Sequence, residues 1–256
     1  MSEQPLRVWL EHDGRLLRLR LARPKANVLD AAMIAELRAA LDAHLSLPTL
    51  SGVLLDAEGP HFSFGASVEE HLPAQCAGML RAMHALVLQM LASPVPILVG
   101  IRGQCLGGGL ELACSAHLLF AAPDTRLGQP EVKLAVFAPA ASCLLPERIG
   151  RAHAEDLLLS GRSIDAHDAH ALGLLNQIAD DPERAALAYF EEHFLAQSAS
   201  SLRLAVRAAR ADLIPRVTDK LAELEELYLS ELMATRDAVE GLEAFLEKRP
   251  ANWQHH

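Results

Sequence analysis

The feature that most constrains the fold of this chain is the segment Val95–Ala122, VPILVGIRGQCLGGGLELACSAHLLFAA. An apolar, largely β-branched run up to Ile101 is followed by glycines at 103, 107, 108 and 109, a helix-compatible segment from Glu111, and a second apolar run from Leu118. This order predicts a strand, a glycine turn, a short helix and another strand. Because glycine has no Cβ, its backbone amide is open to a ligand, and the positive end of a helix dipole favours a negative oxygen there. We therefore expect this segment to supply half of an oxyanion hole.

Length and charge limit the classes of protein that the chain can belong to. Its 256 residues are enough for one large domain with a substantial core. The net charge of −10 argues against a nucleic-acid partner, because phosphate binding needs a dense basic stripe. Cysteines 76, 105, 114 and 143 show no CxxC pair and no zinc spacing, so they are interpreted as reduced thiols. No secretory signal or membrane-spanning stretch is recognisable, and we expect a cytoplasmic protein without a membrane partner.

The N-terminal part of the chain is expected to alternate strands with helices. Leu6–Leu10 and Leu16–Leu21 alternate in polarity around a turn-like His-Asp-Gly and predict a hairpin. Asp30 predicts the N-cap of an amphipathic helix over residues 31–45. The next expected elements are a buried strand at Gly52–Asp56, a loop passing into a helix near Ser67, and a helix at Gln75–Leu91.

Beyond Glu131 the sequence predicts mostly helices. They are expected at residues 138–149, at 152–160 and within 163–173, followed by one short strand at Leu174–Ile178. From Pro182 onward only helices are expected, at 183–196, at 200–214 and as one long helix over about 217–248. The leucines at 221, 224, 227 and 232 lie on one apolar face of this tail, which we expect both to pack on the core and to contact other subunits.

Four segments together resemble one enzyme family. They are FSFGAS (Phe62–Ser67), GQCLGGGLELA (Gly103–Ala113), LGQPEVKLAVFAPA (Leu127–Ala140) and the tail EGLEAFLEKRPANW (Glu240–Trp253). In order and spacing they are similar to the enoyl-CoA hydratase/isomerase, or crotonase, superfamily, and the resemblance runs from about Arg7 to Trp253. It implies an α/β fold in which a spiral of repeated ββα units, residues 1–195, carries the active site. Residues 196–256 are then the C-terminal all-helical region, which serves in trimerisation or as a lid.

The same resemblance implies the chemistry of the site. In this family the carbonyl oxygen of an acyl-CoA thioester binds between two backbone amides, which correspond here to those of Ala66 and Gly108. Such donors stabilise the negative charge that develops on the oxygen as a thioester enolate forms. Glu111 and Glu131 correspond to the two acidic residues of the hydratases. Adding water needs a pair, because one group takes a proton from water while the other gives one to carbon.

Further contacts and partners are implied more loosely. Coenzyme A, as part of the substrate, is expected to contact a set of residues comprising Lys25, Ala26, Val28, Ser67, Val68 and Lys248, with Arg249 as a neighbouring cation. A lysine near the phosphates is electrostatically favourable, although each of these cations is equally well interpreted as a solvated surface charge. Neither a separate cofactor nor a metal ion is expected. The assembly is expected to be a homo-oligomer, either a trimer or a dimer of trimers.

Two departures from the common family pattern suggest a particular branch. The usual Gly-Ala-Asp is here Gly-Ala-Ser67, and the usual Pro-Gly-Ala-Gly is Ala138-Pro139-Ala-Ala. Proline has no N–H, so an amide that would approach the catalytic water is lost. The stretches HFSFGASVEEHLP and VFAPAASCLLPERIG are similar to hydratases of anaerobic benzoyl-CoA degradation. This resemblance implies 1,4-addition of water to a cyclic dienoyl-CoA.

Other interpretations of the same residues stay open. The chain could be a general 2-enoyl-CoA hydratase, an isomerase, or a non-catalytic acyl-CoA-binding member of the family. Considered by spacing alone, Glu111 is a favourable acid at a helix N-terminus and Glu131 a loop charge. Glu69 and Glu70 are reserve acids, and His61 and His71 flank the first oxyanion segment. His167 and His170 have a spacing that suits a metal ion but is more typical of a solvated helix face.

Overall fold

The structure, a computed structural model, describes residues 4–256, so the first three residues of the predicted core region lie outside the described part. Its strands are β1 (Leu6–Glu11), β2 (Leu16–Leu21), β3 (Gly52–Ala57), β4 (Ile97–Ile101), β5 (Gln104–Leu106), β6 (Leu118–Ala121), β7 (Arg126–Gly128), β8 (Ser163–Asp165) and β9 (Gln177–Ile178). Its α-helices are α1 (Ala31–His44), α2 (Cys76–Leu91), α3 (Gly108–Ser115), α4 (Pro139–Ile149), α5 (Arg151–Ser160), α6 (Ala166–Ala171), α7 (Pro182–His193), α8 (Ala199–Ala209), α9 (Leu213–Ser230) and α10 (Arg236–Leu246). Short 3-10 turns are η1 (Glu69–His71), η2 (Pro130–Leu134) and η3 (Leu232–Ala234).

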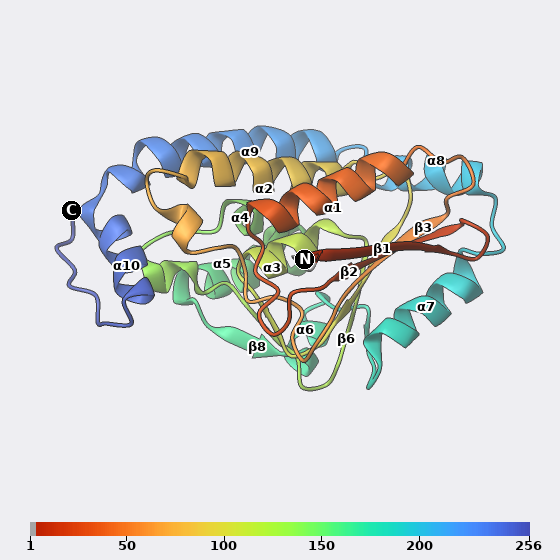
Figure 1. Cartoon of the computed structure of the whole chain (residues 1–256), viewed down its shortest axis with the longest axis horizontal. Helices are drawn as coiled ribbons and strands as arrows, with labels where there is room; N and C mark the ends of the chain where they lie inside the picture. Colours follow the sequence, from red (N-terminus) through yellow and green to blue (C-terminus); the bar gives the residue numbers. More distant parts are fainter. Residues whose placement is uncertain (1–3) are drawn as a thin grey trace.

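A six-stranded sheet in the order β1-β2-β3-β4-β6-β9 forms the centre of the fold. The predicted hairpin pairs β1 with β2 in antiparallel fashion, with Leu6 opposite Leu21, and all following pairs are parallel. Parallel neighbours need long connections, and α1, α2 and α3 provide three of them. In Figure 1, α1, α2 and α9 form a layer along one side of the sheet, while α7 lies on the other side.

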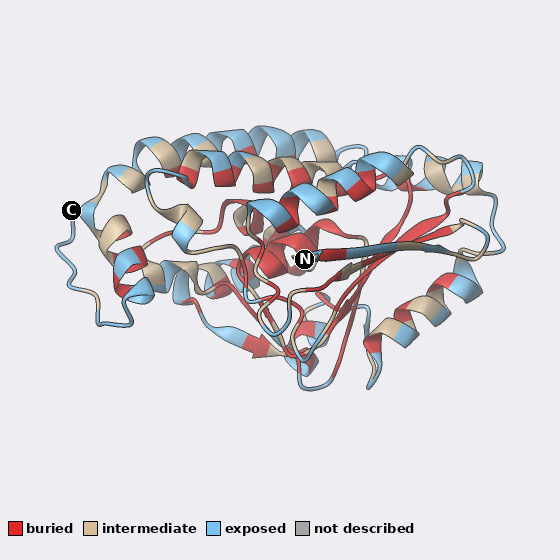
Figure 2. Ribbon diagram, viewed as in Figure 1, coloured by how far each residue is buried: buried red, intermediate tan, exposed pale blue. Residues whose placement is uncertain are grey.

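The two faces of this sheet are buried by different layers. The larger core combines alternate strand residues such as Val53 and Val99 with α1, α2, α3, α4 and α9. The smaller core lies under α7, where Leu54, Leu98 and Phe120 pack against Phe190. Because both faces are covered, β3 and β4 are buried along their whole length (Figure 2). The Gly52–Asp56 and Val95–Ile101 predictions are confirmed.

A second, three-stranded sheet was not predicted. It has the order β5-β7-β8 and pairs Cys105 with Leu127, and Leu127 with Ile164. The sequence pattern instead predicts a glycine turn over residues 104–106 and a helix within residues 163–173, whereas in the structure that helix begins only at Ala166. Strands of three residues carry too little periodicity to be recognised, and their pairing depends on partners far along the chain. In place of the predicted helix near Ser67 the structure has only the 3-10 turn η1. Of the strand predicted at residues 174–178, only the two residues of β9 pair with a neighbouring strand.

The single long helix predicted over about 217–248 is wrong. The chain leaves α9 at Ser230 and starts α10 at Arg236, because Thr235 caps the new helix. The Thr235 hydroxyl accepts a 3.3 Å hydrogen bond from the Ala238 amide and donates to the Leu232 carbonyl at 2.7 Å. The predicted 200–214 helix also ends early, at Ala209, so that Pro215 falls in the first turn of α9, where its missing N–H is tolerated.

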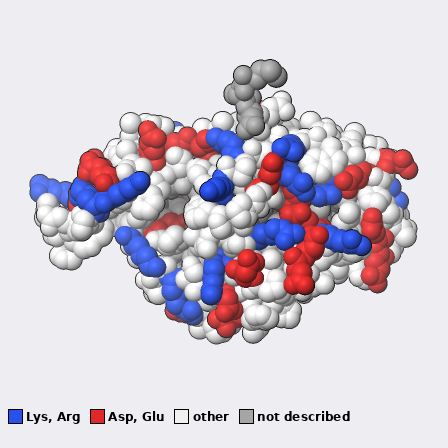
Figure 3. Space-filling view, turned by 60° about the horizontal axis from the view of Figure 1, so that its bottom comes forward, with Lys and Arg blue, Asp and Glu red and all other residues white. Residues whose placement is uncertain are grey.

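Figure 3 shows Lys and Arg side chains interspersed with Asp and Glu over one face, where they form no continuous basic stripe. Within residues 4–256, no helix is both long and apolar enough to cross a membrane. The four cysteines are free and buried.

Candidate active site

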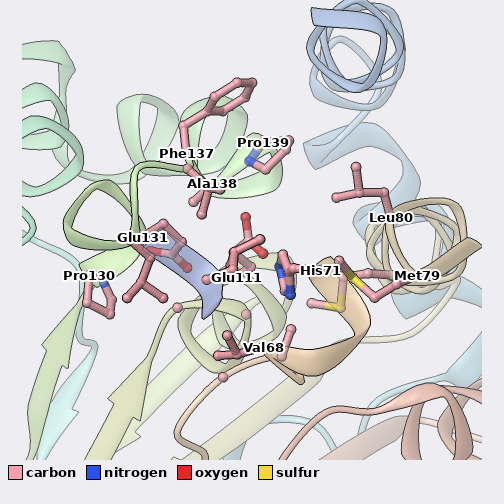
Figure 4. A pocket seen from close by; sticks show the side chains of 18 of the residues that line it. Val68, His71, Met79, Leu80, Glu111, Pro130, Glu131, Phe137, Ala138 and Pro139 are labelled. Carbon is pink, nitrogen blue, oxygen red and sulfur yellow. The ribbon is translucent and has the colours of Figure 1, made fainter. Parts of the chain in front are cut away.

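One cavity contains most of the predicted catalytic groups. Its wall includes the backbone of Ala66 and Gly108 and the side chains of Glu111 and Glu131. Figure 4 shows Glu131 on one side of this pocket, Met79 and Leu80 of α2 on the other, and Glu111 and His71 between them. The rest of the lining is mainly apolar, and it includes Val68, Val136, Phe137, Ala138, Pro139 and Leu242. Residues from α2, α3, η2, α4 and α10 therefore meet at a single site.

The two predicted oxyanion amides lie next to each other. The loop before η1 runs beside residues 26–29: the Phe64 amide donates to Ala26 at 2.9 Å and the Leu29 amide donates to Gly65 at 3.0 Å. The Leu106 amide of β5 donates to Ser63 at 3.0 Å, and this contact places Ala66 beside the N-terminus of α3. Among the described residues, neither the Ala66 amide nor the Gly108 amide has a hydrogen-bond acceptor. Two free donors at one end of an apolar cavity are the arrangement that an oxyanion requires.

Glycine is required where α3 begins. A Cβ at residue 108 would lie 2.9 Å from the Ala66 nitrogen, and one at residue 107 would lie 2.6 Å from Oε1 of Glu131. Gly107 also has a φ of +52°, which L side chains rarely adopt. The glycines therefore let the loop backbone and the Glu131 carboxyl approach the start of the helix.

Glu111 is held by the N-terminus of another helix. It occupies the first turn of α3, is 6% exposed, and its Oε1 accepts a 2.8 Å hydrogen bond from the Ala141 amide of α4. The first amides of a helix have no partner within the helix, so Ala141 is free to donate. The carboxyl group is thereby fixed in orientation inside the cavity.

Glu131 is held by a residue that the sequence analysis missed. The buried side-chain amide of Gln129, with its nitrogen turned toward the carboxyl group, donates to Oε2 and Oε1 of Glu131 at 3.0 and 3.1 Å. Gln129 stands two residues before Glu131 within the GQPEV motif, which is the signal that would have found it. Pro130 starts η2, so this short turn directs both side chains.

Burial makes both carboxyl groups weak acids. It raises the pKa of Glu111 to about 7, and the Ala141 amide opposes this shift by stabilising the charged form. Burial and then the charge of Glu111 raise the pKa of Glu131 to about 8. Because the two groups repel each other when both are ionised, one of them retains a proton near neutral pH. The site therefore offers one proton acceptor and one proton donor.

The predicted coenzyme A contacts are only partly in this cavity. Val68 lines it, whereas Lys25, Ala26, Val28, Ser67 and Lys248 do not. The Ser67 amide donates to Leu29 at 3.2 Å, and its hydroxyl accepts from the Glu70 amide at 3.4 Å. Serine stands here in place of the family's aspartate, and its hydroxyl group contacts one backbone amide of η1. Lys25 and Lys248 are exposed cations outside the cavity.

Other acid and histidine candidates have local roles. The Glu70 carboxylate accepts from the Ala31 amide at 3.1 Å, so it caps α1. His71 lines the cavity, and its Nδ1 lies 2.7 Å from the Ser67 carbonyl oxygen. Among the described residues, no group of three or more metal-ligating side chains includes His167 and His170.

This site and fold define a family. The model of the enoyl-CoA hydratase/isomerase family matches residues 11–256, and the chain belongs to that family, as its motifs predicted. The cyclohexa-1,5-dienecarbonyl-CoA hydratase of Thauera aromatica is 67% identical to it over 257 residues, the full length of both chains. The mitochondrial methylglutaconyl-CoA hydratase of Homo sapiens is 30% identical over 267 residues, which cover 99% of this chain and 78% of the relative.

Solved structures share the fold at lower identity. The enoyl-CoA hydratase from Mycobacterium avium subsp. paratuberculosis K-10 superposes with a TM-score of 0.85, at 23% identity over 98% of each chain. The predicted α/β fold of the crotonase type, with its C-terminal helices, is confirmed.

Proposed function

We propose that this chain adds water to the ring of cyclohexa-1,5-diene-1-carbonyl-CoA, forming 6-hydroxycyclohex-1-ene-1-carbonyl-CoA. The observation that carries the proposal is the pair of free amides, at Ala66 and Gly108, in one cavity with two carboxyl groups. The full-length relative at 67% identity, named for a cyclohexadienecarbonyl-CoA, supports the substrate.

The thioester oxygen binds between the two amides. When water attacks the ring carbon β to the carbonyl, the electron pair of the double bond moves onto that oxygen as an enolate. The amides stabilise this charge, and removing one such donor costs about 2.7–4 kcal/mol. The conjugated second double bond then carries the electrons to the far side of the ring, where a proton completes the 1,4-addition.

The two glutamates supply the proton transfers. The ionised carboxylate takes one proton from water, and the protonated carboxyl gives one to the ring. Because the pKa values of both groups are raised toward neutrality, both forms are present together at physiological pH. Pro139 and Phe137 contribute apolar surface beside this pair, which suits a flat hydrocarbon ring.

Coenzyme A extends from the cavity to the surface in this proposal. Val68 contacts the pantetheine arm near the thioester. Lys25, Ala26, Val28 and Ser67 line its further course, with Lys25 and Lys248 near the phosphates. The reaction needs no separate cofactor, because the thioester itself is the electron sink. The buried free thiols fit a reducing compartment such as the cytoplasm.

The C-terminal region, residues 196–256, is proposed to join subunits into a trimer or a dimer of trimers. It exposes large apolar side chains at Leu204, Leu227, Phe245, Leu246 and Trp253. Such side chains on one region of a soluble domain favour an interface. Light scattering coupled to size-exclusion chromatography gives the subunit number directly.

A substrate comparison tests the function. Purified protein is assayed with cyclohexa-1,5-diene-1-carbonyl-CoA and with crotonyl-CoA, and we expect a higher kcat/KM with the cyclic thioester. A preference for crotonyl-CoA would instead favour a general 2-enoyl-CoA hydratase. Isomerisation without water uptake would favour an isomerase, and binding without turnover would favour an acyl-CoA-binding protein.

A further inference from the structure

The wall that α2 contributes to the cavity contains one polar side chain. Met79, Leu80 and Met83 are apolar, and His84 lies on the same face of the helix. The His84 side chain is only 6% exposed. A nearly buried imidazole among methionine and leucine side chains requires a polar partner.

That partner comes from α9. Nδ1 of His84 lies 2.6 Å from Oε2 of Glu225, which is 141 residues away in the sequence. A carboxylate only accepts hydrogen bonds, so the imidazole hydrogen is on Nδ1. Burial lowers the pKa of His84, against the opposing effect of Glu225, so the ring is neutral near pH 7. The nitrogen left for a ligand, Nε2, is therefore a hydrogen-bond acceptor, and no described residue donates to it.

The proposed reaction transfers only one of the two hydrogens of water. Water has two O–H bonds, and the ionised glutamate takes the proton of only one. The second hydrogen stays on the oxygen and becomes the hydroxyl hydrogen of the product. In an apolar cavity, an unpaired O–H is costly, and an imidazole nitrogen is a suitable acceptor for it.

We propose that His84, oriented by Glu225, is a further catalytic residue, whose Nε2 accepts a hydrogen bond from the attacking water and then from the product hydroxyl. This inference rests on the proposed hydration. His84 exchanges no proton overall, since the hydrogen it contacts stays bound to oxygen throughout. The cyclic diene carries no O–H, so His84 binds the hydroxy thioester and not the diene.

This difference between substrate and product gives an asymmetric kinetic signature. In His84→Leu, hydration is expected to lose about tenfold in kcat with an unchanged KM for the diene. In the dehydration direction, the KM for the hydroxy thioester is expected to rise about tenfold with an unchanged kcat. The two changes leave the equilibrium constant of the reaction intact.

Matched variants distinguish this catalytic role from a purely structural role, in which the His84–Glu225 hydrogen bond only joins α2 to α9. His84→Gln keeps a side-chain oxygen that accepts hydrogen bonds, so it is expected to restore most of the loss. Glu225→Gln is expected to give the His84→Leu pattern, because its amide group allows the other imidazole tautomer. Gln89→Leu is the control: it removes another contact of α2, the 2.6 Å bond from Gln89 to Asp42 of α1, outside the cavity. It is expected to leave both directions unchanged.

The proposal would be overturned if His84→Leu changed the KM for the diene and the KM for the hydroxy thioester equally. It would also be overturned if this variant had the kinetic constants of the wild type in both directions. If the wild type does not hydrate the cyclic diene, the proposed function fails. The role of His84 is then tested by the same asymmetry with crotonyl-CoA and 3-hydroxybutyryl-CoA. A wild type that converts neither pair overturns both proposals.

Discussion

The carboxyl group of Glu111 in α3 accepts a 2.8 Å hydrogen bond from the backbone amide of Ala141, two residues after Pro139 in α4. Pro139 is the first residue of that helix, where a missing N–H is harmless. The departure from the family's glycine pattern therefore leaves the N-terminus of α4 able to hold the carboxyl group of Glu111. The amide that does so is Ala141.

Removing either acidic group is expected to abolish most of the activity. Glu111→Gln and Glu131→Gln keep the shape of the side chain but cannot transfer a proton, so kcat is expected to fall by about 10²–10⁴-fold. Steady-state kinetics with the cyclic dienoyl-CoA measure this. Glu69→Gln, an exposed acid outside the cavity, serves as the control and is expected to match the wild type. Full activity in both cavity variants would indicate a non-catalytic role for the site.

A side chain placed between the amides of Ala66 and Gly108 is expected to destroy the oxyanion site. In Gly108→Ala the new methyl group lies 2.9 Å from the Ala66 nitrogen, so loop and helix must separate. We expect a loss of at least about 100-fold in kcat/KM, as for removal of one oxyanion donor. Gly78→Ala in α2 is the matched control, because its methyl group meets no atom within 4 Å. It should retain activity and gain about 0.5–1 kcal/mol of stability. Near-normal kinetics in Gly108→Ala would contradict the assignment.

The pH dependence of kcat/KM is expected to be bell-shaped with its maximum near neutrality. Activity needs one ionised and one protonated carboxyl, and burial raises the pKa values of Glu111 and Glu131 to about 7 and about 8. Below the lower apparent pKa both groups are protonated, and above the higher one both are ionised. Rates measured between pH 5 and 10 test this. A rate that does not change between pH 5 and 10 would show that neither carboxyl group titrates in this range, and it would contradict the raised pKa values.

The carboxyl group of Glu111 is expected to make the stability of the fold depend on pH. A folded-state pKa raised above the unfolded value stabilises the fold at low pH, and that contribution disappears as the pH rises through the folded pKa near 7. Glu111→Gln lacks this effect, so between pH 5 and 8 its free energy of unfolding should rise relative to the wild type by about 1–3 kcal/mol. Urea unfolding at several pH values measures the difference. A difference that does not change with pH would contradict the raised pKa.

A buried ion pair between β2 and β3, two interior strands of the central sheet, is expected to matter for stability. Asp56 is fully buried in β3 and accepts hydrogen bonds from Arg18 at 2.7 Å and from Arg20 at 3.0 Å, both on the neighbouring strand β2. Asp56→Asn leaves the buried guanidinium of Arg18 with Glu11 as its remaining counter-charge, so unfolding should become easier by about 1–3 kcal/mol. In the control, Asp156→Asn, an exposed pair with Arg162 is lost, and no measurable change is expected. Equal effects in both variants would contradict this account.

The sequence by itself determined the parts of the site that lie close together in the chain. The glycines before Glu111 and the GQPEV motif around Glu131 specify local backbone conformations, and the hairpin and the buried strands follow from short-range polarity patterns. The family followed from the order of these motifs.

Only the tertiary structure decided which groups meet. The Ala141 amide at Glu111, the free amide of Ala66 beside Gly108, and the pairing of His84 with Glu225 all join segments that are distant in the sequence. The small β5-β7-β8 sheet and the break between α9 and α10 likewise depend on long-range pairing and on one capping hydroxyl. Local patterns encode conformation, whereas a hydrogen bond between distant residues exists only once packing has brought them together.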